Sequence, residues 1–244
     1  MGALVPYEPL NVLKPVAPEV WIVDGPEIRF HYLGLRLPFN TRMTLVRLKD
    51  GGLFVHSPVA LTAALGAAVD ALGPVRALIA PNSIHYWWIP DWKARYPRAP
   101  VFGVPRQPRK ARRRFTPDAI LGDAPPAAWA AEIGQVLLRG RVIDEADFFH
   151  GASRTLILTD LIENFEPARV KNRLFRLLVR AFHAADPDGS APYDMRASFD
   201  RRAIRPMVER MIAWNPERVI LAHGRWYDTG GAAELRCAFD WVLR

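Results

Sequence analysis

Three apolar stretches of this chain each lead to a polar residue of a type that binds metal ions. RALIA leads, after a short turn, to His85, TLILTD ends at Asp160, and RVILAH ends at His223. Apolar runs of this length are typical of buried strands. Because ligands collect outside the carboxyl ends of strands in open α/β sheets, we expect these three side chains to converge on one site.

The order of the other patterns predicts an α/β (α+β) fold. Alternating and β-branched runs predict strands, whereas amphipathic or alanine-rich runs that end in glycine or proline predict helices. Strands are expected at 19–25, 75–81, 99–105 and 218–223, hairpins at 41–59 and 142–160, and helices at 60–73, 171–182, 202–217 and in the last 14 or so residues.

Length and composition predict a single soluble domain spanning residues 1–244. Half of the residues are hydrophobic and 24% are charged, which is the balance of a folded globular protein. The segment from about 106 to 135 is rich in arginine, proline and alanine and shows no strand or helix period. We expect it to be an irregular insertion or a lid.

Several classes of protein are disfavoured by the sequence. No apolar run approaches the roughly 20 residues of a membrane span, and the first residues lack a basic start followed by an apolar segment. We therefore expect a cytoplasmic protein with no membrane partner. Cys237 is the single cysteine, which leaves no internal disulfide and no thiolate cluster. Any metal ion must be bound by nitrogen and oxygen atoms.

The net charge of +8 comes in good part from the run RQPRKARRR, residues 106–114. A run of this kind is most often a solvated face of a loop or helix, and we favour that interpretation. The alternative is that Arg106 to Arg114 bind an anion or a nucleic acid. No nucleic-acid-binding motif or phosphate loop accompanies the run, so a nucleic-acid partner is not favoured.

His150 is a candidate for a fourth metal ligand. It ends the apolar run ADFFH, directly before the turn into the strand of Asp160. In the following HGASRT, Ser153 and Arg154 could bind a substrate anion beside His150, although Gly-Ala-Ser-Arg is also an ordinary turn. All three residues therefore have a functional and a structural interpretation.

The segment NSIHYWW around His85 is the natural place for substrate-binding residues. Asn82, Tyr86 and Trp87 lie within three residues of the histidine. Their rings could form an aromatic wall for a ligand, or they could pack the loop onto the core. Purely structural alternatives exist for the strand-end residues too: Asp160 and His223 could cap backbone groups, and His85 could be an aromatic packing partner.

Four segments in order resemble the metallo-β-lactamase superfamily: LFVHSP, LIAPNSIH, TLILTDL and RVILAHG. Within it, NSIHYWW followed by FFHGASRTLILTDL resembles the DUF4336 family. This resemblance covers about residues 19 to 240. It implies a four-layer αββα sandwich, with the site at one edge between the two sheets.

The chain departs from the superfamily pattern in its first metal-binding loop. Where the superfamily places several histidines and an aspartate, this chain has only His85, and His56 stands in place of an early acidic residue. The resemblance therefore implies a reduced or rearranged site that holds one zinc or iron ion. The alternative is that the site holds no metal at all.

These observations lead to three functional hypotheses. The first is a metal-dependent hydrolase of a small ester, lactone or phosphoester, with Asp160 and His85 as catalytic residues and an ion held by His85, His150, Asp160 and His223. The second is a non-catalytic module that binds a small molecule or a metal on the same fold. The third, and least favoured, is anion or nucleic-acid binding by the arginine-rich run.

Overall fold

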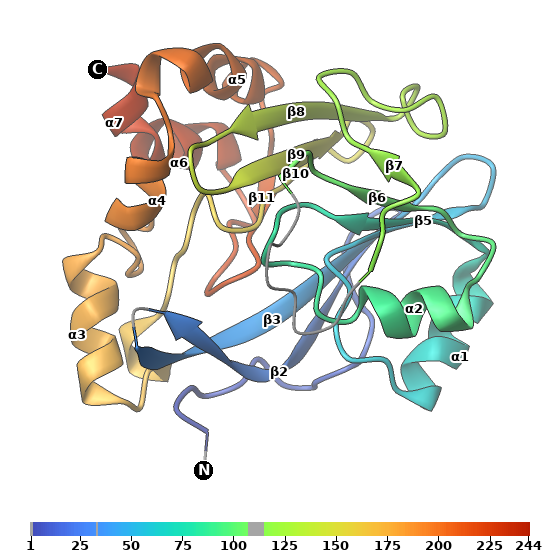
Figure 1. Cartoon of the computed structure of the whole chain (residues 1–244), viewed down its shortest axis with the longest axis horizontal. Coiled ribbons are helices and arrows are strands. Elements are labelled where there is room, and N and C mark those ends of the chain that lie inside the picture. The colour runs from blue at the N-terminus through green and yellow to red at the C-terminus, as the bar shows by residue number, and fades with distance from the viewer. Residues whose placement is uncertain (1, 33, 107–114) are drawn as a thin grey trace.

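Two β-sheets pack against each other at the centre of the computed structural model, which describes residues 2–32, 34–106 and 115–244 (Figure 1). The larger sheet has seven strands in the order β1-β2-β3-β4-β5-β6-β7, and the smaller has four in the order β11-β10-β9-β8. Each sheet therefore buries one face against the other.

The larger sheet begins as an antiparallel meander and continues as parallel strands. Its first four strands pair antiparallel, and from β4 to β7 every pair is parallel. The carboxyl ends of β4 and β5 consequently lie at one edge. The strands are β1 Lys14–Ala17, β2 Val20–Tyr32, β3 Leu35–Arg47, β4 Leu53–His56, β5 Val75–Ala80, β6 Val101–Gly103 and β7 Ala119–Ile120.

The smaller sheet combines an antiparallel meander with one parallel pair. β8, β9 and β10 pair antiparallel in sequence order, and β11 then adds parallel to β10. The chain therefore leaves β10 and β11 at the same edge, as the sequence pattern predicts. The strands are β8 Ile133–Arg139, β9 Asp144–His150, β10 Thr155–Ile157 and β11 Arg218–Ile220.

Helices cover the outer faces of both sheets and give a four-layer arrangement (Figure 1). The outer face of the larger sheet is covered by α1 (Ala63–Leu72) and α2 (Ile89–Arg95), and the outer face of the smaller one by α5 (Arg201–Ala213), α6 (Gly231–Ala238) and α7 (Asp240–Leu243). A 3₁₀ turn (Pro167–Arg169), α3 (Arg173–Ala181) and α4 (Tyr193–Ser198) lie between β10 and α5 in the chain. Within the described chain, no helix combines the length and apolar character needed to cross a bilayer.

Aromatic side chains fill the space between the sheets. The Phe54 ring on β4 lies 5.1 Å, centroid to centroid, from the rings of both Trp129 and Phe148. Along β9 the side chains alternate between faces, so Phe148 enters this central core whereas Phe149 stacks on Trp214 of the α5 layer. This alternation places Ala146 and Phe148 in the central core and Phe149 in the core beneath the α5 layer.

The elements predicted from the sequence are present, with two differences of extent, whereas β1, α2 and α4 were not predicted. The predicted strand 19–25 continues to Tyr32 and pairs with an equally long β3, across a bulge between Gly25 and Ile28. In the segment predicted to be irregular, 106–135, the described residues contain the two-residue β7 and the start of β8. Residues 107–114 lie outside the described chain, and the assignment of a lid stays a prediction.

Replacing Phe148 with alanine is expected to lower the free energy of unfolding by about 3–5 kcal/mol, since it leaves a cavity against Phe54 and Trp129. Urea denaturation followed by circular dichroism measures this change. The matched control is Val142→Ala, because Val142 is 74% exposed and its truncation should cost less than about 0.5 kcal/mol. Equal losses in the two variants would contradict the assignment of Phe148 to the central core.

Candidate metal centre

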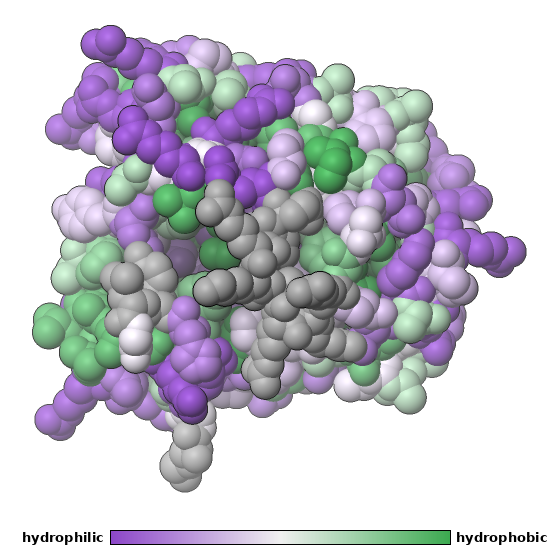
Figure 2. Space-filling view, viewed as in Figure 1, coloured by the Kyte–Doolittle hydropathy of each residue, from purple (hydrophilic) through white to green (hydrophobic). Residues whose placement is uncertain are grey.

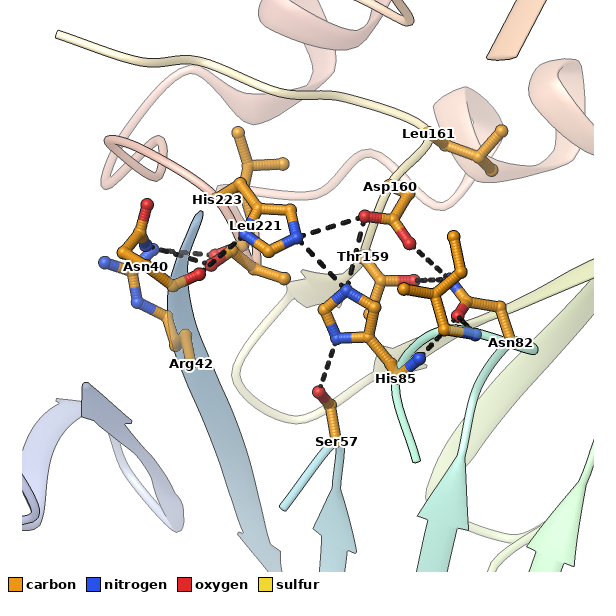
Figure 3. A network of polar contacts seen from close by, with 12 residues as sticks. Asn40, Arg42, Ser57, Asn82, His85, Thr159, Asp160, Leu161, Leu221 and His223 are labelled. Carbon is orange, nitrogen blue, oxygen red and sulfur yellow. Dashed lines mark hydrogen bonds and ion pairs between the residues drawn. The ribbon is translucent and has the colours of Figure 1, made fainter. Parts of the chain in front are cut away.

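His85, Asp160 and His223 meet at one point in the structure, as Figure 3 shows. The Oδ1 atom of Asp160 lies 3.2 Å from the Nε2 atom of His85 and 3.1 Å from that of His223. The two Nε2 atoms lie 3.2 Å apart. All three side chains are at least nine-tenths buried. Two imidazole nitrogens and one carboxylate oxygen therefore form a compact cluster that could hold a metal ion.

The strand topology explains this convergence. His85 follows β5 of the larger sheet, whereas Asp160 and His223 follow the parallel neighbours β10 and β11 of the smaller one. Parallel neighbours end at the same edge, which brings the last two residues together. The loop after β5 then adds His85 from across the gap between the sheets.

The backbone of Asn40 on β3 sets the tautomer of His223. The carbonyl oxygen of Asn40 lies 2.7 Å from the Nδ1 atom of His223, and a carbonyl can only accept a hydrogen bond. His223 must therefore carry its proton on Nδ1 and direct the lone pair of Nε2 at the cluster. The side chain of Asn40 holds the same loop by donating to the carbonyl of Ala222 and accepting from the amide of Gly224.

His85 is held by a residue on each side of it. Its Nδ1 atom lies 2.7 Å from the hydroxyl of Ser57, which follows β4. The side-chain oxygen of Asn82 accepts hydrogen bonds from the backbone amides of Ile84 and His85, each at 2.8 Å. This local turn fixes the position of the histidine after β5.

Asn82 also connects His85 to Asp160. Its amide nitrogen donates to the Oδ2 atom of Asp160 at 2.6 Å and to the Oε2 atom of Glu145 at 2.9 Å. Glu145 in turn accepts hydrogen bonds from the backbone amides of Thr159, Asp160 and Leu161. A buried network thus orients the carboxylate of Asp160 and leaves its Oδ1 atom for the histidines.

The electrostatics of the cluster favour a cation at its centre. Burial lowers the pKa of His85, but the charge and hydrogen bond of Asp160 outweigh burial, so the net shift is upward. The pKa of Asp160 is held well below its usual range by both histidines, in spite of its burial, and burial lowers the pKa of His223. Two imidazole nitrogens and an ionised carboxylate in contact need a shared proton or a metal ion between them.

The three residues line a cavity of about 460 Å³. Its other walls come mainly from apolar side chains of the β2–β3 hairpin, α3 and the loop before α2, and the carboxyl group of Glu163 also lines it. Burial, followed by the neighbouring Asp160, raises the pKa of Glu163 well above its usual value. Figure 2 shows the surface hollowed beside α3. The cluster is therefore accessible to a ligand in the cavity.

The structure places His150 apart from this cluster. His150 ends β9 and is paired with Thr155, the first residue of β10, whereas Asp160 follows the opposite end of β10. Its Nδ1 atom is 2.8 Å from the hydroxyl of Ser153. Arg154 donates to the backbone carbonyl of Asn215. These three residues form the β9–β10 turn and do not line the cavity, because the antiparallel turn lies at the other end of the sheet.

The predicted substrate-binding residues of the NSIHYWW segment divide into two groups. Trp87, with Trp88, lines the cavity. Asn82 is fully buried and orients His85 and Asp160 instead of facing the cavity. Tyr86 is buried and its ring stacks on that of Phe115, 5.5 Å away. The rings of this loop therefore serve both as cavity wall and as packing.

Two residues that hold the histidines of the cluster could not be predicted from the sequence, because their roles depend on long-range contacts. Nothing local distinguishes Asn40 or Ser57, which face the histidines only through the pairing of the strands. Glu145 is an acidic residue in the strand DEADFFH, whose residues are all buried. A buried carboxylate needs several hydrogen-bond donors, so this acidic residue was a signal that the sequence did contain. Sequence reasoning overlooked it.

A family model described as "Domain of unknown function (DUF4336)" matches residues 19–198. The chain belongs to the DUF4336 family. This agrees with the resemblance seen in the sequence around His85 and Asp160. No protein of curated function matches the chain.

Solved structures similar to this DUF4336 chain include metallo-β-lactamases. A metallo-beta-lactamase from Pontibacter korlensis is 13% identical, with 96% of this chain and 99% of that chain covered and a TM-score of 0.61. One from Hirschia baltica is also 13% identical, with 95% and 97% covered and a TM-score of 0.60. One from Erythrobacter litoralis is 12% identical, with 95% and 89% covered and a TM-score of 0.54. At such identities the similarity shows the fold alone, and it confirms the predicted metallo-β-lactamase-like sandwich.

The network around Asn82 leads to a first prediction for the site. Asn82→Ala should lower the free energy of unfolding by at least about 2 kcal/mol, because buried carboxylates lose their donors. It should also weaken metal binding roughly 10- to 100-fold, as expected for a residue that orients ligands. Chemical denaturation and zinc titration measure the two effects. Asp200→Ala, which removes the N-cap of α5, should lower stability without changing zinc affinity.

His56 leads to a prediction of pH dependence. It ends β4 beside the ring of Phe148, and burial lowers its pKa from 6.5 to about 3. Between these two pH values, the unfolded chain binds more protons at His56 than the folded chain does. The contribution of His56 therefore makes the protein less stable as the pH falls below 6.5, by at most about 1.4 kcal/mol per pH unit.

Measuring unfolding free energies from pH 7 to 4 tests this sign. His56→Leu should show a shallower loss of stability toward acid than the natural chain. The control is His31→Leu, at an exposed position on β2, which should leave the slope unchanged. A His56→Leu slope equal to that of the natural chain would show that His56 is not kept neutral by burial.

Proposed function

We propose that this protein holds one zinc or iron ion on His85, Asp160 and His223 and hydrolyses an ester, lactone or phosphoester bound in the adjoining cavity. The observation that carries the proposal is the contact of two imidazole nitrogens and one carboxylate oxygen on the wall of a ligand-sized cavity. Two nitrogens and one oxygen suit either ion and leave coordination positions for water.

The spacing of the donor atoms supports this assignment. Zinc lies about 2.0–2.2 Å from nitrogen and oxygen ligands, so tetrahedral ligand atoms are separated by about 3.3 Å. The three donor atoms are 3.1–3.2 Å apart. The remaining nitrogens are held by Asn40 and Ser57, as outer hydrogen bonds hold histidines in metal sites. The residues present therefore fit a bound ion.

A bound ion would lower the pKa of coordinated water toward about 7 and polarise the ester oxygen. The chain itself supplies the rest. Asn82 and Glu145 keep the carboxylate of Asp160 oriented, and the apolar cavity walls limit access of bulk water. Glu163 lines the cavity three residues after Asp160, and its raised pKa suits it to give a proton to the leaving oxygen.

The same donor set favours one ion over two. Among the described residues, His85, Asp160 and His223 form the single cluster of three or more potential metal-binding side chains. His150, the fourth residue predicted from the sequence, bonds to Ser153 at the far end of β10. We therefore propose a mononuclear site without His150.

Substitution of the clustered residues tests the metal site. Protein purified from zinc-supplemented medium should contain about one equivalent of metal by elemental analysis, and His223→Ala and Asp160→Ala should contain less than about 0.2. Hydrolysis of p-nitrophenyl acetate or a phosphodiester should fall by at least about 100-fold in the same variants.

His150→Ala is the matched control, because it removes a histidine from a neighbouring strand without touching the cluster. It should keep both the metal and the activity. Loss of metal in His150→Ala but not in His223→Ala would overturn the proposed ligand set. Activity that persists in His223→Ala and Asp160→Ala would show that the cluster is not the catalytic centre.

The second hypothesis, a non-catalytic binding module, is favoured by the small number of metal-binding side chains in the cluster. It predicts about one equivalent of bound metal but no hydrolysis of any ester above the rate of the His223→Ala variant. Metal content and activity measured on the same preparation therefore separate the two hypotheses.

A further inference from the structure

The cavity beside the cluster is larger and more apolar than a small polar substrate needs. Its volume of about 460 Å³ lies within the usual range for drug-sized ligands. A short ester such as an acetate would leave most of it unfilled. The shape of its apolar walls therefore indicates what else the substrate carries.

One wall is a continuous stripe along α3. Phe175, Leu178, Val179 and Phe182 all line the cavity. They follow the helical spacing i, i+3, i+4 and i+7, so they share one face of the helix over about 10 Å. This face offers an elongated apolar surface.

A second stripe that lines the cavity lies on β3, and its Leu37 and Phe39 pack against the cluster that contains Phe175 and Val179 of α3. Leu35, Leu37 and Phe39 line the cavity and alternate along the strand, so they share one face over about 13 Å. The two stripes meet near the candidate metal centre, because the Phe39 ring lies 5.8 Å from that of Phe175 and 4.9 Å from that of His223. A ligand lying in the cavity along both stripes would have one end at His223.

We propose that the cavity binds an extended apolar chain, so that the substrate is an ester or lactone with a medium-length or long acyl group. The chain lies in the cavity along the stripes of α3 and β3, and its carbonyl end reaches His85, Asp160 and His223. The identity of the reacting group rests on the proposed function, whereas the binding of the chain can be tested without any turnover.

Binding of two alcohols that cannot be hydrolysed, 1-butanol and 1-octanol, tests the chain site by calorimetry on the purified protein. Each added methylene that is buried should tighten binding about fourfold, so 1-octanol, with four more methylenes, should bind roughly 250-fold more tightly than 1-butanol. Equal affinity for the two alcohols would overturn the proposal.

Tryptophan substitutions at neighbouring positions locate the chain. Leu178→Trp fills the cavity from α3 and should weaken binding of 1-octanol at least 10-fold. Leu177→Trp, on the same helix but 64% exposed, should leave it unchanged. An equal loss of affinity for 1-octanol in both variants would show that the alkyl chain does not bind along the cavity-facing side of α3.

A second pair of variants covers the case in which Leu178→Trp does not fold. Leu37→Trp fills the cavity from β3, whereas Arg36→Trp lies at an exposed neighbouring position on the same strand. Leu37→Trp should weaken binding of 1-octanol, and Arg36→Trp should not. Circular dichroism identifies variants that are folded.

The outcomes separate this inference from the proposed function. Tight binding of 1-octanol that is lost in Leu178→Trp supports the chain site even if the protein contains no metal and hydrolyses nothing. Hydrolysis of p-nitrophenyl acetate that depends on His223, combined with equal binding of both alcohols, supports the proposed function and overturns the chain site. If the chain site and the proposed function are both correct, p-nitrophenyl octanoate should have a lower KM than p-nitrophenyl acetate.

Discussion

The arrangement of the candidate metal centre depends on one buried carboxylate, Glu145. It accepts hydrogen bonds from the backbone amides of Thr159, Asp160 and Leu161 and from the side chain of Asn82. Burial and the nearby Asp160 raise the pKa of Glu145, and the hydrogen bonds from Asn82 and Thr159 oppose that shift. A buried carboxylate without such donors would be strongly destabilising. The donors come from the loops after β5 and β10, so satisfying Glu145 joins the two sheets at the site.

The third ligand is held from the opposite side by β3. Arg42 is almost fully buried, is paired with Asp24, and donates hydrogen bonds to the carbonyls of Leu221 and Gly224. These carbonyls flank His223, whose Nδ1 atom bonds to the backbone of Asn40 two residues away on the same strand. The long β3 of the larger sheet therefore fixes the last loop of the smaller sheet. Asp160 and His223 are thus each oriented by a residue of the larger sheet, Asn82 and Asn40 respectively.

The difference between the three clustered residues and the residues that hold them explains which features could be predicted from the sequence. The positions of His85, Asp160 and His223 follow from local patterns, because each comes at the end of an apolar strand. Their supports do not, since Asn40 and Ser57 reach the histidines only through the pairing of strands distant in the sequence. His150 illustrates the limit: it also ends a strand, but β9 runs antiparallel to β10, so its end lies away from Asp160. The hairpin predicted at 142–160 already implied this antiparallel direction, and the prediction of His150 as a ligand did not take it into account.

The loop around His85 shows why this site has few ligands. Asn82 is committed to the buried network, Tyr86 packs on Phe115, and Trp87 and Trp88 form cavity wall. In this loop, only His85 places a potential metal-ligand atom beside those of Asp160 and His223. The other side chains of the loop therefore serve the buried network, the packing of the core and the wall of the cavity. In physical terms, the loop contributes one potential metal-binding group and otherwise shapes an apolar space beside it.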